Sequence, residues 1–108
     1  MVDVERKNQE HNLVWLNGRV GGKILFAETR SGEPAFSFGV HIDGSLGVVR
    51  ARVNAYGDLA VKCRDLIRRN VRCAVVGELM NRSGRMGELT EVRAKDVSVL
   101  DGGQSGEG

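Results

Sequence analysis

Alternation of apolar and polar residues dominates the first half of the chain and predicts short β-strands. Residues 35–42 read A-F-S-F-G-V-H-I, in which Phe36, Phe38 and Val40 alternate with smaller or polar residues. A period of two places these apolar side chains on one face of a strand, toward a core. The preceding T-R-S-G-E-P has the composition of a turn, and Pro34 suits the entrance of a strand.

Residues 13–20, L-V-W-L-N-G-R-V, alternate in the same way and predict an earlier strand. Trp15 and Arg19 fall on the face opposite the apolar one. Gly18 inside this run indicates a bulge or a sharp bend, a device that small barrels use to turn their strands.

The strand predicted over residues 48–56, V-V-R-A-R-V-N-A-Y, is the most sharply divided by side-chain type. Val and Ala occupy one face, whereas Arg50, Arg52, Asn54 and Tyr56 occupy the other. A face of two guanidiniums, an amide and a phenol suits a nucleic-acid strand. An ordinary solvated sheet face is the alternative for this strand taken alone.

The period then changes to that of a helix over residues 58–69, D-L-A-V-K-C-R-D-L-I-R-R. We expect Asp58 to cap its N-terminus and Asn70 to adopt the left-handed conformation at its exit. Arg68 and Arg69 lie where the helix dipole favours positive charge. Their charge thus has a structural explanation, and neither is counted as a ligand contact.

Two further strands are predicted over residues 71–80 and 88–100, with a bend at 94–96. The connection between them carries Arg82 and Arg85 and has no aromatic residue. Five strands with one helix between the third and the fourth argue against a parallel sheet. The order predicts an all-β protein, a five-stranded antiparallel OB-fold barrel with one α-helix between strands three and four.

The length of 108 residues indicates one domain. We expect a flexible segment over residues 1–11, the OB-fold domain over 12–101 and a disordered Gly-rich tail over 102–108. No stretch has the roughly 18 apolar residues of a membrane helix, and the polar N-terminus lacks the apolar core of a signal peptide. These features predict a cytoplasmic protein with no membrane partner.

Catalytic and metal chemistry find no support in the residue pattern. Cys63 and Cys73 form no C-x-x-C pair and lie far along the chain from His11 and His41, so we expect buried thiols and no zinc site. No nucleophile–base pair or carboxylate pair emerges, and G-R-V-G-G-K lacks the spacing of a phosphate loop. We therefore expect no enzyme activity, no cofactor, no metal and no small-molecule substrate.

Charge is distributed unevenly, although the net charge is only +2. Between residues 50 and 95 there are eleven Lys and Arg side chains against five Asp and Glu. This basic bias points to a polyanionic partner.

Four stretches, in order, resemble the bacterial single-stranded DNA-binding protein (SSB) family over residues 12–101. They are V-W-L-N-G-R-V (14–20), R-S-G-E-P-A-F-S-F-G-V (30–40), R-V-N-A-Y-G-D-L-A (52–60), and V-V-G-E-L (75–79) followed by L-T-E-V (89–92). The resemblance implies an OB-fold that binds single-stranded DNA without strong sequence preference in replication, recombination or repair. It also implies a homo-oligomer, a dimer or tetramer, in the bacterial cytoplasm at the nucleoid, with replication or repair proteins as further partners.

The chain departs from that family mainly in its aromatic residues. Tyr56 alone stands at a matching stacking position, and Arg50 occupies the place of a Trp in the third strand. Ser83, Gly84 and Arg85 replace the aromatic expected in the last hairpin. The printed sequence also ends without the family's acidic, aromatic-ended tip, so a short paralogue or a primosomal-type relative fits the same pattern.

These considerations select the candidate contacts to nucleic acid, each of whose arginines could instead be a solvated surface residue. Trp15 is a candidate for base stacking or for packing at a subunit interface. The alternative function is an OB-fold interaction module of a primosome-like replication assembly with little direct DNA binding, which the scarcity of aromatics favours. The candidate nucleic-acid-binding residues are Arg19, Arg30, Arg50, Arg52, Tyr56, Arg82 and Arg85.

Overall fold

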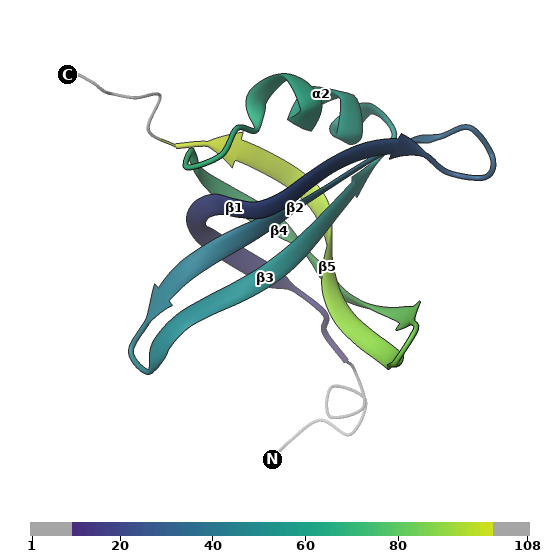
Figure 1. The fold of residues 1–108 in the computed structure, drawn as a ribbon. Coiled ribbons are helices and arrows are strands. Elements are labelled where there is room, and N and C mark those ends of the chain that lie inside the picture. The colour runs from purple at the N-terminus through teal and green to yellow at the C-terminus, as the bar shows by residue number, and fades with distance from the viewer. Residues whose placement is uncertain (1–9, 101–108) are drawn as a thin grey trace, which may run out of the picture.

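A computed structural model of the protein describes residues 10–100, which form a closed five-stranded barrel with one helix (Figure 1). The predicted tail, 102–108, lies outside the described residues, as does all of the predicted flexible segment 1–11 except its last two residues. The strand order around the barrel is β1-β2-β3-β5-β4. The elements are β1 (Val14–Glu28), β2 (Pro34–Gly44), β3 (Gly47–Tyr56), α2 (Asp58–Leu66), β4 (Arg72–Gly84) and β5 (Gly87–Val99).

This layout confirms the predicted OB-fold, with its helix between the third and fourth strands. Four of the strand pairs are antiparallel, as expected. The fifth pair, β3 with β5, is parallel and short, and it joins Val53 to Val92 and Asn54 to Arg93. This parallel contact closes the barrel and brings the middle of β5 beside the middle of β3.

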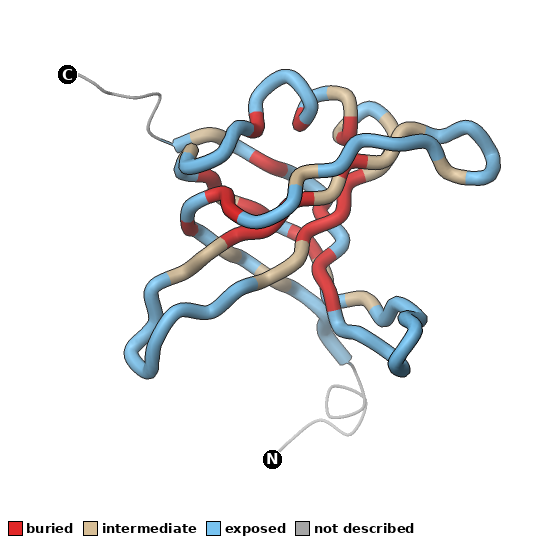
Figure 2. Tube along the Cα trace, in the orientation of Figure 1, coloured by how far each residue is buried: buried red, intermediate tan, exposed pale blue. Residues whose placement is uncertain are grey.

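The core lies inside the barrel and beneath α2, where buried segments of all five strands converge (Figure 2). Phe36, Phe38 and Val40 are buried, which confirms the inward face predicted for β2. Burying a side chain of this size contributes roughly 1.5–3 kcal/mol. The outward residues between them are therefore free to serve another purpose.

The first strand is longer than predicted and bends later than expected. Its register with β2 shifts between Gly21 and Leu25, so the bend lies there and the prediction of a bulge at Gly18 is wrong. Gly18 is required for a different reason, because a Cβ at this position would collide with the backbone oxygen of His41. Apolar and polar residues do not alternate in the G-G-K run, and the strand predicted from the sequence therefore ended at residue 20 instead of Glu28.

The predicted basic loop between the last two strands is itself a paired ribbon (Figure 1). Pairing continues to Gly84 and Gly87, which leaves only Arg85 and Met86 in the turn. The bend predicted at 94–96 is confirmed as a bulge, because the register shifts there opposite Val76 and Gly77.

The helix is shorter than predicted and starts differently. Gly57, at φ 66°, is the N-cap and no side chain bonds the helix start, so the prediction that Asp58 caps the helix is wrong. Asp58 lies in the first turn, where the helix dipole favours its charge. At the other end the left-handed Asn70, at φ 72°, is confirmed. Arg68 donates to the carbonyl oxygens of Arg64 at 3.0 Å and Ile67 at 3.1 Å.

Both cysteines are free and buried, which confirms the predicted thiols. Burial raises the pKa of Cys63 and of Cys73 to about 11, so both stay protonated at neutral pH. Within residues 10–100, no three His, Cys, Asp or Glu side chains gather as metal ligands would. Over the same residues the structure contains no helix long and apolar enough to cross a membrane.

Candidate nucleic-acid interface

The strand register orders the outward side chains of β2 and β3 into rungs that continue onto neighbouring strands. From one end of β3 to the other, the outward residues are Arg50, Arg52, Asn54 and Tyr56. Each has a partner on β2 and a further one on β1, and two of the four rungs also extend to β4 or β5. The rungs are Arg72–Arg19–His41–Arg50, then Gly21–Gly39–Arg52, then Leu25–Ser37–Asn54–Arg93, and last Ala27–Ala35–Tyr56.

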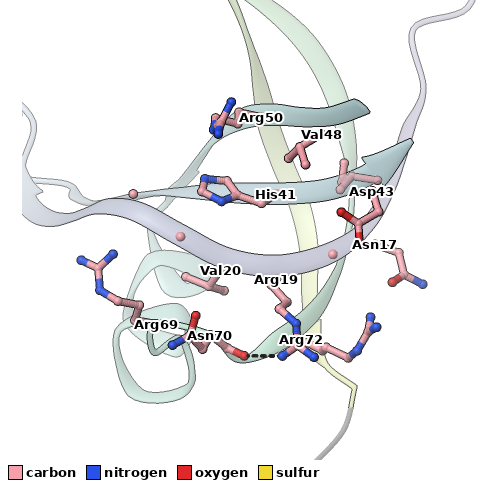
Figure 3. A pocket seen from close by; sticks show the side chains of 14 residues that line it. Asn17, Arg19, Val20, His41, Asp43, Val48, Arg50, Arg69, Asn70 and Arg72 are labelled. Atoms are coloured by element: carbon pink, nitrogen blue, oxygen red, sulfur yellow. Dashed lines mark hydrogen bonds between the residues drawn. The ribbon is translucent and has the colours of Figure 1, made fainter. Parts of the chain in front are cut away.

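The first rung places three arginines and a histidine side by side on four adjacent strands. We call Arg72, Arg19, His41 and Arg50 the basic row. They line a groove of about 590 Å³, together with Arg69 and residues of β1 (Figure 3). Among the described residues that line this groove, Asp43 alone is acidic.

The exit of α2 is docked against β1 and brings two arginines to this groove. Val20 of β1 forms two backbone hydrogen bonds with the residues after α2. Its N–H donates to Val71 O at 2.8 Å, and its carbonyl oxygen accepts from Asn70 N at 2.8 Å. Arg19 Nη1 also donates to Asn70 O at 3.1 Å (Figure 3). The left-handed turn at Asn70 thus sets Arg69 and Arg72 on either side of the docked residues.

The charges of the groove are uncompensated within the described part of the chain. None of Arg19, Arg50, Arg69 and Arg72 forms an ion pair with another residue of 10–100, where four such pairs occur elsewhere. Clustered like charges in a groove raise the local concentration of an oppositely charged ligand. The groove is therefore suited to an anion.

In the second rung, the side chain of one arginine lies across two glycines. A Cβ on Gly39 would approach Gly21 O to 2.6 Å, so the bare backbone at this rung is required. Arg52 Nε donates to Ser37 Oγ at 2.8 Å and its Nη1 donates to Lys23 O at 2.6 Å. Burial lowers the pKa of Arg52, against a raising effect of Glu91 and a further lowering by Arg82. The two hydrogen bonds fix Arg52 in place, and a guanidinium keeps its charge in proteins.

The third rung lies beside a buried carboxylate. Asn54 was expected on an exposed polar face, but it is only 7% exposed and that expectation is wrong. Its Nδ2 donates to Glu91 Oε1 at 2.8 Å, and Arg82 Nη1 lies 3.5 Å from the same oxygen. Glu91 reaches this position from β5 and is itself 8% exposed. We call Arg52, Asn54, Arg82 and Glu91 the Glu91 cluster.

The last rung carries the one Phe, Tyr or Trp that points outward from β2 or β3. Tyr56 is half-buried and lines a shallow hollow of about 230 Å³ with Leu25, Ser37 and Arg82. The Arg93 guanidinium carbon lies 5.1 Å from the centre of its ring, within the range of a cation–π contact. Stacking on Arg93 orients the ring.

The structure therefore divides the sequence-predicted residues into three groups. Arg19 and Arg50 belong to the basic row, Tyr56 and Arg82 line the hollow at the other end of the face, and Arg52 lies between them. Arg30 and Arg85 are exposed in the turns after β1 and β4 and belong to neither group.

Trp15 points outward from β1 beside Val76 of β4 and is 76% exposed. It lies on the same outward side of β1 as Arg19, four residues away. Sequence reasoning missed five residues of this face. Four of them are placed by the pairing of strands distant in sequence and Arg69 by the turn at Asn70; the five are His41, Arg69, Arg72, Arg93 and Glu91.

Comparison with known proteins supports the fold. No protein-family model matches the chain, and no curated protein does. Among solved structures, the SSB domain of a protein from Synechococcus sp. is similar, with a TM-score of 0.70 and 21% sequence identity. The match covers 83% of this chain and 97% of that one. The chain thus shares its fold with an SSB domain, as the resemblance over residues 12–101 implied.

Proposed function

We propose that the protein binds single-stranded DNA, without strong sequence preference, on the outward face of β2 and β3. The observation that carries the proposal is the register, which aligns three arginines and a histidine across four strands at one end of this face and sets Tyr56 at the other. Arg50 and Tyr56 lie six positions apart on β3, a length of about 20 Å. This length accommodates several nucleotides of a single strand.

The mechanism combines phosphate neutralisation with limited stacking. Arginines that contact phosphates release counterions, so affinity falls as salt rises. Each base stacked on an aromatic contributes about 1–3 kcal/mol, but β2 and β3 offer only Tyr56. A guanidinium plane also stacks on a base and supplies part of the missing contact. We therefore expect binding that depends more on salt than in an aromatic-rich OB-fold.

The hairpins contribute the remaining proposed contacts. Arg85 and Arg30 extend the positive charge beyond the sheet from their exposed turns. Arg82 contacts DNA while paired with Glu91, so its share of phosphate neutralisation is smaller than that of an unpaired arginine. The proposed role is binding rather than catalysis, in replication, recombination or repair at the bacterial nucleoid.

We also propose that the chain forms a homo-oligomer, a dimer or tetramer, through the apolar end of the outward face of β1 and β4, at Trp15 and Val76 and away from the Arg19–Arg72 pair. Leu13 and Trp15 are each 76% exposed, and Val76 lies beside Trp15 on the neighbouring strand. Burial of this apolar surface against a second copy would stabilise an assembly. Sedimentation velocity of the wild type and of Trp15→Arg tests this, because the variant should shift toward monomer. A wild-type monomer at high concentration would contradict it.

A second candidate function is an OB-fold interaction module of a replication assembly that touches DNA little. One outward aromatic on β2 and β3, together with the exposed Trp15, favours this alternative. The basic row opposes it, since a groove lined by four arginines concentrates positive charge where an anionic ligand can bind.

Fluorescence anisotropy with labelled oligo-dT at about 50 mM and about 200 mM salt separates the two candidates. Neutralising four phosphates of a single strand gives a slope of about −2.8 in log affinity against log salt, or roughly 50-fold weaker binding over this range. No binding at the lower salt would overturn the proposed function and favour the interaction module. Strong binding that persists unchanged at the higher salt would contradict the phosphate mechanism.

A further inference from the structure

We propose that the bound strand does not stop at the edge of β2 but crosses the basic row and lies in the groove over β1 and β4. Its phosphates there are held by Arg19, Arg69 and Arg72. This inference rests on the proposed function and adds to it the direction of the strand and a phosphate site that includes the exit of α2. The bound DNA strand then runs across the β-strands at this end of the face.

The first argument is the span of the basic row. Neighbouring strands lie about 4.8 Å apart, so the Cα atoms from Arg72 to Arg50 cover about 14 Å. In a helix, the phosphates of one strand repeat about every 3.4 Å along the helix axis, and they lie further apart when the strand is stretched. The basic row therefore spans at least two consecutive phosphates and suits a chain of anions better than a single ion.

The second argument is the hydrogen-bonding capacity left in the groove. Arg19 uses one donor on Asn70 O, and a guanidinium has five. Arg50, Arg69 and Arg72 donate no side-chain hydrogen bond to any residue between 10 and 100. These donors match the planar, bidentate recognition of phosphate oxygens.

The third argument is what lines the groove. Gly18, Gly21 and Gly22 lie along the groove on β1. Of these Gly22 is exposed, and a Cβ on it would meet nothing within 4 Å, so a ligand can approach the backbone closely at this position. No Phe, Tyr or Trp of the described chain lines it, so base stacking there is limited to the His41 imidazole and the guanidinium planes. A site rich in arginine and without Phe, Tyr or Trp is suited mainly to the sugar–phosphate backbone.

The fourth argument is continuity with the proposed DNA-binding face. Arg50 lines the groove and is also the first outward arginine of that face, two residues before Arg52 (Figure 3). A strand that contacts Tyr56 and follows β3 therefore reaches the groove without leaving the basic surface.

The double variant Arg19→Ala with Arg72→Ala tests the proposal by its salt slope with oligo-dT. Loss of two phosphate contacts should make the slope shallower by about 1.4. Lys62→Ala with Arg64→Ala is the control, because it removes the same charge from the surface of α2 and should leave the slope as in the wild type. Arg19→Lys with Arg72→Lys keeps both charges and should retain most of the slope.

The outcomes separate this inference from the function on which it rests. No binding of oligo-dT by the wild type would overturn the proposed function itself. Salt-dependent binding by the wild type, with the same slope in the Arg19→Ala, Arg72→Ala variant, would overturn only the path through the groove. If that variant instead lost binding of a labelled poly-glutamate peptide while its DNA slope was unchanged, the groove would belong to an acidic peptide and the inference would be wrong.

Discussion

The basic row and the Glu91 cluster are neighbours on one polar face, and they differ in how their charges are paired. In the basic row the arginines have no acidic partner within residues 10–100. In the Glu91 cluster a buried carboxylate bonds Asn54 and pairs with Arg82, while Arg52 is held by Ser37 and Lys23. Similar residue types thus form an open anion site in the basic row and a satisfied network in the Glu91 cluster.

This difference suggests a division of roles. A charge that is already paired has its geometry fixed by the fold, and a ligand must compete for it. An unpaired surface charge costs the fold little and is available to a ligand. We therefore expect the Glu91 cluster to stabilise the face on which Tyr56 lies and the basic row to supply most of the electrostatic affinity.

The largest expected effect on stability follows from removing the carboxylate of the Glu91 cluster. Glu91→Ala leaves the buried Asn54 amide without its 2.8 Å acceptor. A hydrogen bond to a charged group is worth about 1.5–3 kcal/mol, and the free energy of unfolding in urea should fall by that amount. The control Glu88→Ala, exposed on the same strand, should change it by less than about 0.5 kcal/mol. Equal losses in the two variants would remove the distinction between paired and free charges.

A smaller effect on stability is expected at Gly21, in the rung next to the basic row. A Cβ on Gly21 would lie 2.5 Å from Cε1 of His41, so Gly21→Ala should destabilise the fold by about 1–2 kcal/mol through overpacking. In a His41→Ala background the same substitution should cost much less, because the ring is gone. Urea unfolding of the four proteins in a double-mutant cycle measures this coupling. The same cost in both backgrounds would show that the ring does not lie on Gly21.

The smallest expected effect on stability is that of Arg50→Ala. This side chain is exposed and unpaired within the described residues, so unfolding should change by less than about 0.5 kcal/mol. The same variant should make the salt slope of oligo-dT binding shallower by about 0.7, for one phosphate contact. A stability loss as large as that of Glu91→Ala would mean that the basic row is structural.

The sequence pattern was sufficient to predict the barrel, because the alternation that marks a strand and the period that marks a helix are local features of the sequence. Alternation in residues 35–42 identified the inward face of β2, and the change of period at Asp58 located the helix. The same pattern failed at Asn54, because its burial depends on Glu91 from β5. A parallel contact between strands so far apart in sequence leaves no trace in the alternation of either.

The sequence predicted which site residues lie together only where they belong to one strand. Arg50, Arg52 and Tyr56 were found together because all three occupy β3. The basic row combines four strands, and its Arg72 depends on how the exit of α2 docks on Val20. Arg69 was explained by the helix dipole in the sequence, yet its position in the groove follows from the turn at Asn70.

The proposed mechanism, phosphate neutralisation with base stacking on Tyr56, is tested most directly by comparing oligo-dT with an abasic oligonucleotide of equal length, using the wild type and Tyr56→Ala in the same anisotropy titration. We predict that Tyr56→Ala weakens binding of oligo-dT by about 1–3 kcal/mol, or roughly 5- to 150-fold, for the loss of one stacked base. Binding of the abasic strand, held by phosphate contacts, should be unchanged. Equal weakening for both strands would contradict the account, because Tyr56 would then act on the backbone or on the fold.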